Sequence, residues 1–226
     1  MASKPLTVAA GLIAAVLPAA MARAQAPGQA RAEGDALLAQ AGAADLFDNL
    51  TARDAADIKL RHKASGLVCG FNLGQPANRV VVFDSSVRGD DIACATGGEA
   101  GERTLYASRT PGRTLDDAFA HDLAEVKKSH PDAEPYALPP GTDSPILKML
   151  AIPPMPPSKT ARFIAGHRFT SVSSAVVMDW SLEFRFTCPE EHQDDAAGTV
   201  QPTLWVTILA QMSGAPLDLV GPKRAV

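Results

Sequence analysis

The clearest pattern in the chain lies between residues 180 and 188, where apolar and polar side chains alternate without interruption. The apolar positions are Trp180, Leu182, Phe184, Phe186 and Cys188. A period of two over such a stretch is typical of a β-strand with one buried face. Looser alternation over residues 162–178 predicts one or two partner strands.

Four shorter segments in the first half of the chain also favour strands. They are residues 67–73, 79–84, 92–96 and 104–109. The Gly, Pro, Asn and Asp residues between them are typical of turns. The simplest arrangement is an antiparallel meander of these four strands in chain order.

Helical spacing of apolar residues is found in two places. Residues 35–50 are rich in Ala and Leu and predict a first helix. Thr114 and Asp117 form a capping box before an apolar stripe that Pro131 ends, which predicts a second helix. Residues 203–212 fit a strand by their β-branched content and a helix by their place before a Gly-Ala-Pro stop, so both remain open.

Together these elements predict an α+β protein, a mainly antiparallel sheet of about seven or eight strands with two or three helices packed on one face. The length suits a single domain. We expect a signal peptide at residues 1–24, a flexible lead-in at 25–34, one domain at 35–219 with a proline-rich loop at 131–159, and a loose tail at 220–226.

The N-terminal segment has the layout of a secretory signal peptide. Lys4 gives a positive start, residues 6–20 are apolar, and Ala22-Arg23-Ala24 matches a small-residue cleavage box. The apolar run is too short for a spanning helix and Pro18 interrupts it. We therefore expect a periplasmic or secreted protein, cleaved after Ala24, with no stable membrane insertion after cleavage.

The charge balance argues against nucleic acid as a partner. The chain has 21 Lys and Arg against 25 Asp and Glu, and the signal segment contains two of the basic residues, Lys4 and Arg23, and no acidic one. The mature chain therefore has 19 basic and 25 acidic residues, a net charge of −6. Nucleic-acid binding needs a basic face that displaces counterions.

Three cysteines remain in the mature chain, and an oxidising compartment favours one disulfide and one free thiol. Cys188 lies on the apolar face of its strand, so we expect it to be the free buried thiol. Cys69 and Cys94 face inward in their strands and are expected to form the disulfide. A plain meander would separate them by two strand spacings, about 9–10 Å, whereas a disulfide needs Cα atoms within about 7 Å. The expected bond therefore argues against the meander.

The sequence shows no convincing metal or cofactor motif. A zinc site built from the three cysteines and His62 would lack paired Cys-x-x-Cys spacing. The acidic turn that contains Asp84, Ser86, Asp90 and Asp91 does not follow the order of an EF-hand calcium loop. We expect neither a bound metal nor a cofactor.

Two hypotheses for function are compatible with these observations. The leading one is a non-enzymatic binding or envelope-associated module that contacts an envelope protein or a small ligand through the proline-rich loop. Its candidate contact residues are Tyr136, Met149 and Met155. The alternative is an envelope hydrolase that uses polar residues near His62 and the Asp90 and Asp91 pair, which would have to converge in a cleft. The sequence assigns no catalytic residue.

Two short motifs carry a resemblance to a known group of proteins. They are Ser65-Gly66-Leu67-Val68-Cys69-Gly70-Phe71 and Gly89-Asp90-Asp91-Ile92-Ala93-Cys94, followed by Leu105-Tyr106. This stretch, residues 58–110, resembles uncharacterised secreted proteobacterial proteins. The resemblance implies no activity. It favours Cys69 and Cys94 as a structural pair.

Overall fold

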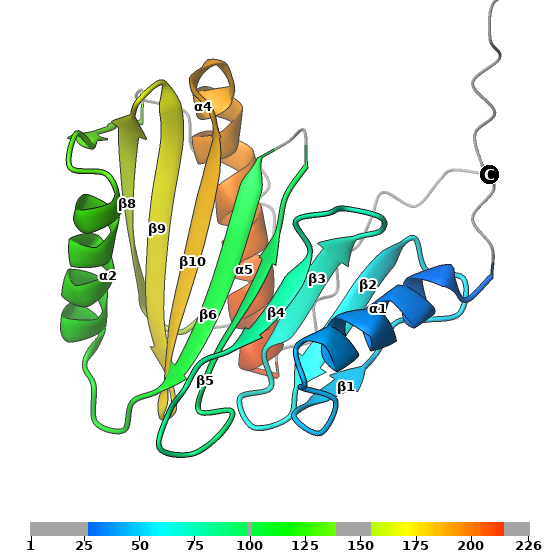
Figure 1. The fold of residues 1–226 in the computed structure, drawn as a ribbon. Coiled ribbons are helices and arrows are strands. Elements are labelled where there is room, and N and C mark those ends of the chain that lie inside the picture. Colours follow the sequence, from blue (N-terminus) through cyan, green and yellow to red (C-terminus); the bar gives the residue numbers. More distant parts are fainter. Residues whose placement is uncertain (1–26, 99–100, 139–154, 215–226) are drawn as a thin grey trace, which may run out of the picture.

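The computed structural model describes residues 27–98, 101–138 and 155–214 and divides the strands between two antiparallel sheets (Figure 1). The smaller sheet has the order β1-β2-β3, with β1 (Phe47–Asn49), β2 (Asp57–His62) and β3 (Val68–Asn72). The larger sheet has the order β4-β5-β6-β10-β9-β8-β7. Its strands are β4 (Arg79–Val82), β5 (Asp91–Thr96), β6 (Glu102–Arg109), β7 (Glu134–Pro135), β8 (Ser158–Ala165), β9 (Arg168–Val177) and β10 (Trp180–Pro189). The α+β class is confirmed.

The expected four-strand meander is wrong in its first strand. β4, β5 and β6 do follow one another in the larger sheet, but β3 pairs with β2 instead of β4. Sequence analysis did not identify β2, in which charged residues alternate with Ile58, Leu60 and His62. The third inward residue of β2 is a histidine, which is not counted as apolar, so the segment does not show a complete alternation of apolar and polar residues.

The first helix begins and ends earlier than expected. α1 (Gln29–Gln40) replaces the helix expected at residues 35–50, and the chain then turns into β1. Residues 29–34 are therefore helical and not a flexible lead-in. Leu37 and Leu38 are buried, and Gly34 lies against the side chains of Asn49 and Ile58, where a Cβ atom would come within 3.0 Å of the Ile58 Cγ2. This close packing on β1 and β2 explains why a glycine is tolerated inside the helix.

The strands expected near residues 162–178 form two long hairpins with β10. β8, β9 and β10 are consecutive antiparallel neighbours. Gly166 and His167 form the β8–β9 turn with φ of 51° and 63°, a pair of left-handed residues that suits the twist of a two-residue hairpin. The His167 side chain is 96% exposed at this turn.

Helices cover both faces of the larger sheet, not one face as expected (Figure 1). Neighbouring residues of β9 show this, because successive side chains of a strand point to opposite faces. Ser174 donates to Asp122 of α2 (Leu115–Ser129), whereas Ser173 accepts from Gln201 of α5 (Gln201–Met212). The open question at residues 203–212 is thus settled as helix. Three short turns lead from β10 into α5: η1 (Glu190–His192), α4 (Gln193–Asp195) and η2 (Ala196–Val200).

The main core fills the space between the two sheets, α1 and α5, and a smaller cluster lies under α2. The smaller cluster consists of Val126, Phe163 and Val172. Within the described parts of the chain, no helix is both long enough and apolar enough to cross a bilayer.

The capping box expected before α2 is confirmed. Thr114 has extended backbone angles, and its Oγ1 accepts a hydrogen bond of 3.1 Å from the Asp117 main-chain N–H. The same hydroxyl donates to the Asp117 carboxylate at 2.7 Å. One of the N–H groups that a helix start leaves unpaired is thus satisfied.

We expect Thr114→Ala to lower the free energy of unfolding by about 1 kcal/mol, because the variant leaves that N–H without its side-chain acceptor. Urea denaturation followed by circular dichroism measures the change. Thr114→Ser is the matched control, since serine keeps the hydroxyl and should unfold near the wild-type midpoint. Equal midpoints for the alanine and serine variants would contradict a capping role.

Candidate functional site

A cleft opens where α5 crosses the larger sheet beside β3. It has a volume of about 280 Å³, and we call it the α5 cleft. Its walls come from β2, β3, β5, β6, β10 and α5, which are distant in sequence. A second hollow of about 360 Å³ adjoins it and shares Thr96, Arg103 and Leu204 with it. The two hollows therefore lie next to each other on the α5 side of the sheet, and together we call them the depression.

Two rows of side chains across β5, β6 and β10 line the depression. In the first row Cys94, Leu105 and Phe184 lie opposite one another in register, and in the second row Thr96, Arg103 and Phe186 do so. Residues opposite one another in an antiparallel sheet share a face. The alternation predicted for residues 180–188 therefore supplies the two phenylalanines of this surface.

The opposite wall belongs to α5. Leu204 and Ile208, one helical turn apart, face the cleft together with Thr207 and Gln211. Trp205 packs behind them, with its ring stacked on Phe184 at a centroid distance of 6.1 Å. The helix is therefore fixed against the sheet by a buried aromatic pair while its apolar neighbours remain available to a ligand.

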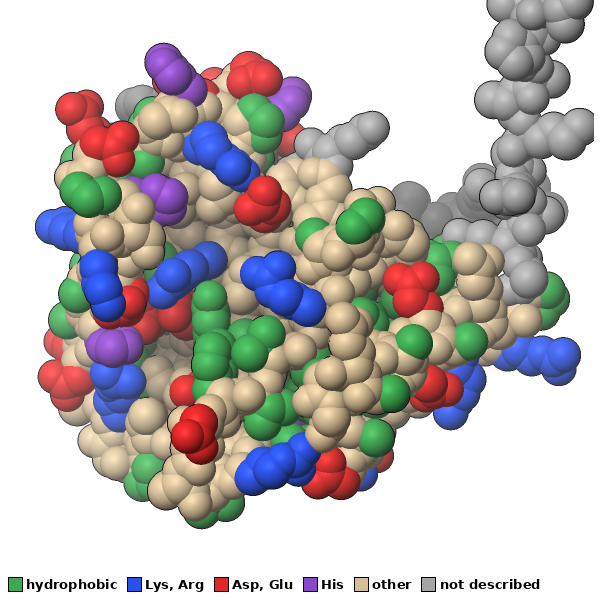
Figure 2. All heavy atoms as spheres, viewed as in Figure 1, with side chains coloured by type: hydrophobic (Ala, Val, Ile, Leu, Met, Phe, Trp, Pro, Cys, Tyr) green, Lys and Arg blue, Asp and Glu red, His purple; other side chains and the backbone are tan. Residues whose placement is uncertain are grey.

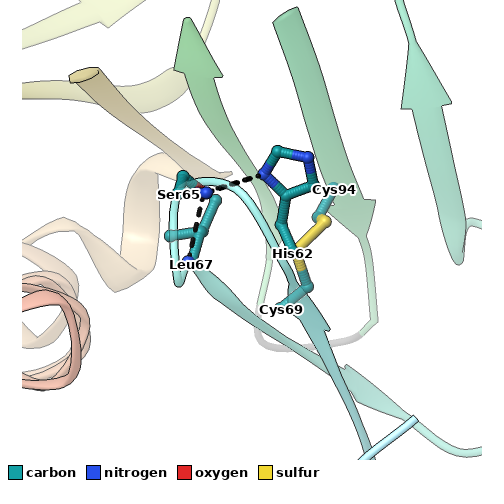
Figure 3. The surroundings of a disulfide bond; sticks show 5 residues. All are labelled: His62, Ser65, Leu67, Cys69 and Cys94. Atoms are coloured by element: carbon teal, nitrogen blue, oxygen red, sulfur yellow. Dashed lines mark hydrogen bonds between the residues drawn. A yellow bond between two sulfur atoms is a disulfide. The ribbon is translucent and has the colours of Figure 1, made fainter. Parts of the chain in front are cut away.

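The Cys69–Cys94 disulfide joins the two sheets at the floor of the cleft (Figure 3). The Cα atoms are 6.0 Å apart, within the range that a disulfide tolerates. The conflict between the bond and a plain meander disappears because β3 and β5 belong to different sheets, so no strand separates them. The expected pair is confirmed.

Arg103 is the one charged residue that lines both hollows. Its side chain is half-buried between Thr96 and Phe186, and burial lowers the pKa of its guanidinium. Arginine nevertheless stays protonated in proteins at neutral pH. Among the residues that the structure describes, none forms an ion pair or a side-chain hydrogen bond with this guanidinium. A partly desolvated cation without an acceptor is suited to bind an anion.

The rim of the cleft contributes further polar groups. Lys59 and Asp57 form an exposed ion pair of 3.5 Å on the outer surface of β2. Because these two charges neutralise each other, Arg103 dominates the electrostatics of the cleft. Apolar walls with one positive charge that no described residue compensates suit an amphipathic anion.

The side chains of the hydrolase hypothesis do not converge in a cleft. His62 is fully buried between Phe47 and Trp180, with ring centroids 5.0 and 5.6 Å away, and burial lowers its pKa. Its Nδ1 lies 2.9 Å from the Ser65 hydroxyl, which also accepts a bond from the Leu67 N–H (Figure 3). This hydroxyl therefore stabilises a tight turn.

The acidic residues of that hypothesis have other partners. Asp90 lies 3.8 Å from Arg109, and Asp91 accepts a hydrogen bond of 2.8 Å from Ser108. Asp84 is exposed. No group of three or more metal-binding side chains is found within the described ranges.

The proposed contact loop is only partly described. Tyr136 packs edge-on against Phe169, and its hydroxyl donates to Asp194 at 2.6 Å. Burial and this carboxylate raise its pKa to about 12. Met155 is half-buried against the main core, and Met149 lies outside the described residues. Neither Tyr136 nor Met155 lines the α5 cleft.

Cys188 is a free cysteine with a fully buried side chain. Burial raises the pKa of its thiol. A thiol that is hard to ionise and closed to solvent is a poor nucleophile. It therefore contributes packing to the apolar face of β10.

Comparison of the chain with models of protein families and with curated proteins finds no match. Arg103 was not predicted as a site residue, because an arginine in a strand with alternating polarity normally faces solvent.

Proposed function

We propose that this chain is an exported, non-enzymatic binding protein that holds an amphipathic anion in the α5 cleft. The observation that carries the proposal is Arg103, a half-buried guanidinium with no acceptor among the described residues, at the junction of two hollows with apolar walls. The apolar part of the ligand contacts Phe184, Leu204 and Ile208, and its negative group binds Arg103.

Export to the periplasm or the cell exterior is part of the same proposal. The signal-like segment at residues 1–24 supports it, and so does the disulfide, because such bonds persist in oxidising compartments. The hydrolase alternative has no comparable support, since His62 is buried and lies outside the cleft.

The amphipathic anion 1-anilinonaphthalene-8-sulfonate provides a direct test, since its fluorescence rises in apolar sites. We expect saturable binding to the wild-type protein and binding weaker by about tenfold or more in Arg103→Met, which removes a charge-assisted hydrogen bond. Equilibrium fluorescence titration measures both affinities.

Arg79→Met is the matched control. Arg79 is an exposed residue of β4, carries the same charge and does not line the cleft. It should bind the dye as the wild type does. If the two methionine variants lose the same affinity, or if the wild type binds no dye, the α5 cleft is not the site of an amphipathic anion.

A further inference from the structure

β3 is an edge strand, and its free edge borders the α5 cleft. Among the strands that the structure describes, β3 pairs only with β2. The segment Val68 to Phe71 lines the cleft from this side. Half of the main-chain N–H and C=O groups of an edge strand point away from its sheet and are available to another chain.

The hydrogen bonds of β2 identify which residues of β3 point outward. The Lys59 carbonyl accepts from Leu50 N–H, and the Lys59 N–H donates to Thr51 Oγ1 at 3.0 Å, so both groups turn away from β3. Lys59 lies opposite Gly70. Opposite residues of an antiparallel ladder alternate between pairs that hydrogen-bond to each other and pairs that do not. In a pair of the second kind, both residues turn their main-chain N–H and C=O groups away from each other, and Lys59 and Gly70 form such a pair. The Gly70 N–H and C=O therefore point to the free edge.

The same alternation places the main-chain groups of Val68 and Asn72 at the free edge. The carbonyl of Asn72 does point away from β2, because it accepts a hydrogen bond of 2.6 Å from Asn78 Nδ2, which is not part of the ladder. Within the described ranges, the outward groups of Val68 and Gly70 have no hydrogen-bond partner. Two neighbouring positions of β3 thus offer a donor and an acceptor each, beside an apolar cleft.

This edge has none of the usual protection against strand pairing. Natural edge strands carry lysine, proline, bulges or inward charges that prevent it. At one end of the larger sheet, β8 has Lys159 and Arg162, and the two-residue edge strand β7 pairs with part of it. Val68 to Phe71 contains neither charge nor proline. Gly70 has no side chain, and a Cβ built there would have no atom within 4 Å, so the face of β3 at this position is open.

We propose that the free edge of β3 binds an extended polypeptide segment of a partner protein as an added strand, with a carboxylate of that segment on Arg103. This rests on the proposed function and names the class of its ligand. Alternate side chains of an added strand point to one face, so one set contacts Leu105, Leu204 and Ile208 in the cleft. Charge complementarity selects the partner, because an acidic side chain or a free C-terminus supplies the acceptor that Arg103 lacks among the described residues.

A random octapeptide library with free C-termini, displayed on phage, is the probe for this proposal. Enriched peptides are then synthesised with a C-terminal carboxylate or amide and with N-methyl groups at alternate residues. We expect the C-terminal amide to weaken binding of those peptides whose C-terminal carboxylate binds Arg103. We expect N-methylation of one of the two alternating sets of peptide residues to abolish binding, because it removes the N–H groups that pair with β3. No enrichment over a blank support overturns the proposal.

Gly70→Pro and Gly70→Ala form the matched pair of protein variants. Proline deletes the outward N–H of Gly70 without breaking the ladder to β2, whereas alanine keeps it. We expect peptide affinity to fall about tenfold or more in Gly70→Pro and to stay near wild type in Gly70→Ala. Should Gly70→Pro fail to fold, the N-methylated peptides test the complementary bonds on the wild-type protein, those that peptide N–H groups donate to the outward carbonyls of β3.

The outcomes separate this inference from the proposed function. If the dye still depends on Arg103 but peptide binding ignores both Gly70→Pro and N-methylation, the cleft binds small anions and the strand-addition proposal is wrong. Loss of the Arg103 dependence for dye and peptide alike overturns both. A wild-type protein that dimerises in sedimentation, with Gly70→Pro monomeric and no peptide bound, assigns the edge to a second copy and also overturns the proposal.

Discussion

Replacing Cys69 and Cys94 together by alanine is expected to lower the free energy of unfolding by about 3.5 kcal/mol, the loop-closure term for two cysteines 25 residues apart. Both side chains are almost completely buried, at 1% and 6% exposure. The bond is also the covalent link between the smaller sheet and the larger one. Its loss should therefore release β3 from the floor of the α5 cleft and weaken ligand binding as well.

Guanidinium denaturation of the oxidised and reduced proteins measures this effect. The reduced wild type should unfold near the double alanine variant, and reductant should not change the variant further. Cys188→Ala is the control, because Cys188 is not in the bond and this variant must remain sensitive to reductant. Identical unfolding of oxidised wild type and double variant would show that the disulfide contributes no stability.

Glu183→Gln is expected to remove a large pH dependence of stability. Glu183 lies on the α2 face of β10 with its side chain 12% exposed, and burial raises its pKa to about 7. The nearby Asp122 of α2 raises it further, whereas the ion pair with Arg185 opposes the shift. Glu125 and Tyr106 also face this group. The face of the molecule seen in Figure 2 mixes basic, acidic and apolar side chains.

The direction follows from proton linkage. Between pH 4.5 and about 7 the folded protein keeps a proton on Glu183 that the unfolded chain has lost. The unfolded state binds fewer protons there, so stability falls as pH rises through this window. A shift of this size corresponds to about 3 kcal/mol. We expect the variant to resemble wild type near pH 4.5 and to exceed its stability above pH 7.5.

The free energy of unfolding of both proteins from pH 4 to 9 measures this difference. The comparison must be between variant and wild type, because burial lowers the pKa of His62 and gives an opposite slope below its ordinary value of 6.5. Glu134→Gln is the control, because it makes the same change at an exposed position of β7 that is not among the charges acting on Glu183. Parallel profiles for Glu183→Gln and wild type would disprove the linkage.

The local pattern of side chains was sufficient to predict those helices and strands whose formation depends mainly on the residues within them. The alternation at residues 180–188 and the capping box at Thr114 both correspond to the elements in the structure. The cysteines also carried information on tertiary structure, because the distance limit of the expected disulfide argued against the plain meander before any strand order was known.

The local pattern did not predict the secondary structure of segments whose conformation is decided by packing against residues distant in the sequence. Residues 203–212 contain β-branched side chains that fit a strand, yet they form α5, because one helical face packs on the sheet through Trp205 and Leu209. Propensity differences of a few tenths of a kcal/mol per residue are smaller than the burial energy of two large apolar side chains. Strand β2, which was not predicted, is a similar case. Its inward His62 packs against Phe47 and Trp180 and hydrogen-bonds to Ser65, and these contacts cannot be read from the local sequence.

The sequence by itself determined the α+β class, most of the strands, the helix at Thr114 and the disulfide pair, because each depends on local periodicity or on chemistry with a fixed reach. Only the tertiary structure decided the two-sheet arrangement, the helices on opposite faces and the α5 cleft. Arg103 is the clearest example. Its neighbours Thr96 and Phe186 and the facing Leu204 come from three other elements. That no described residue pairs with its guanidinium is a property of the space around it, which only the tertiary structure defines.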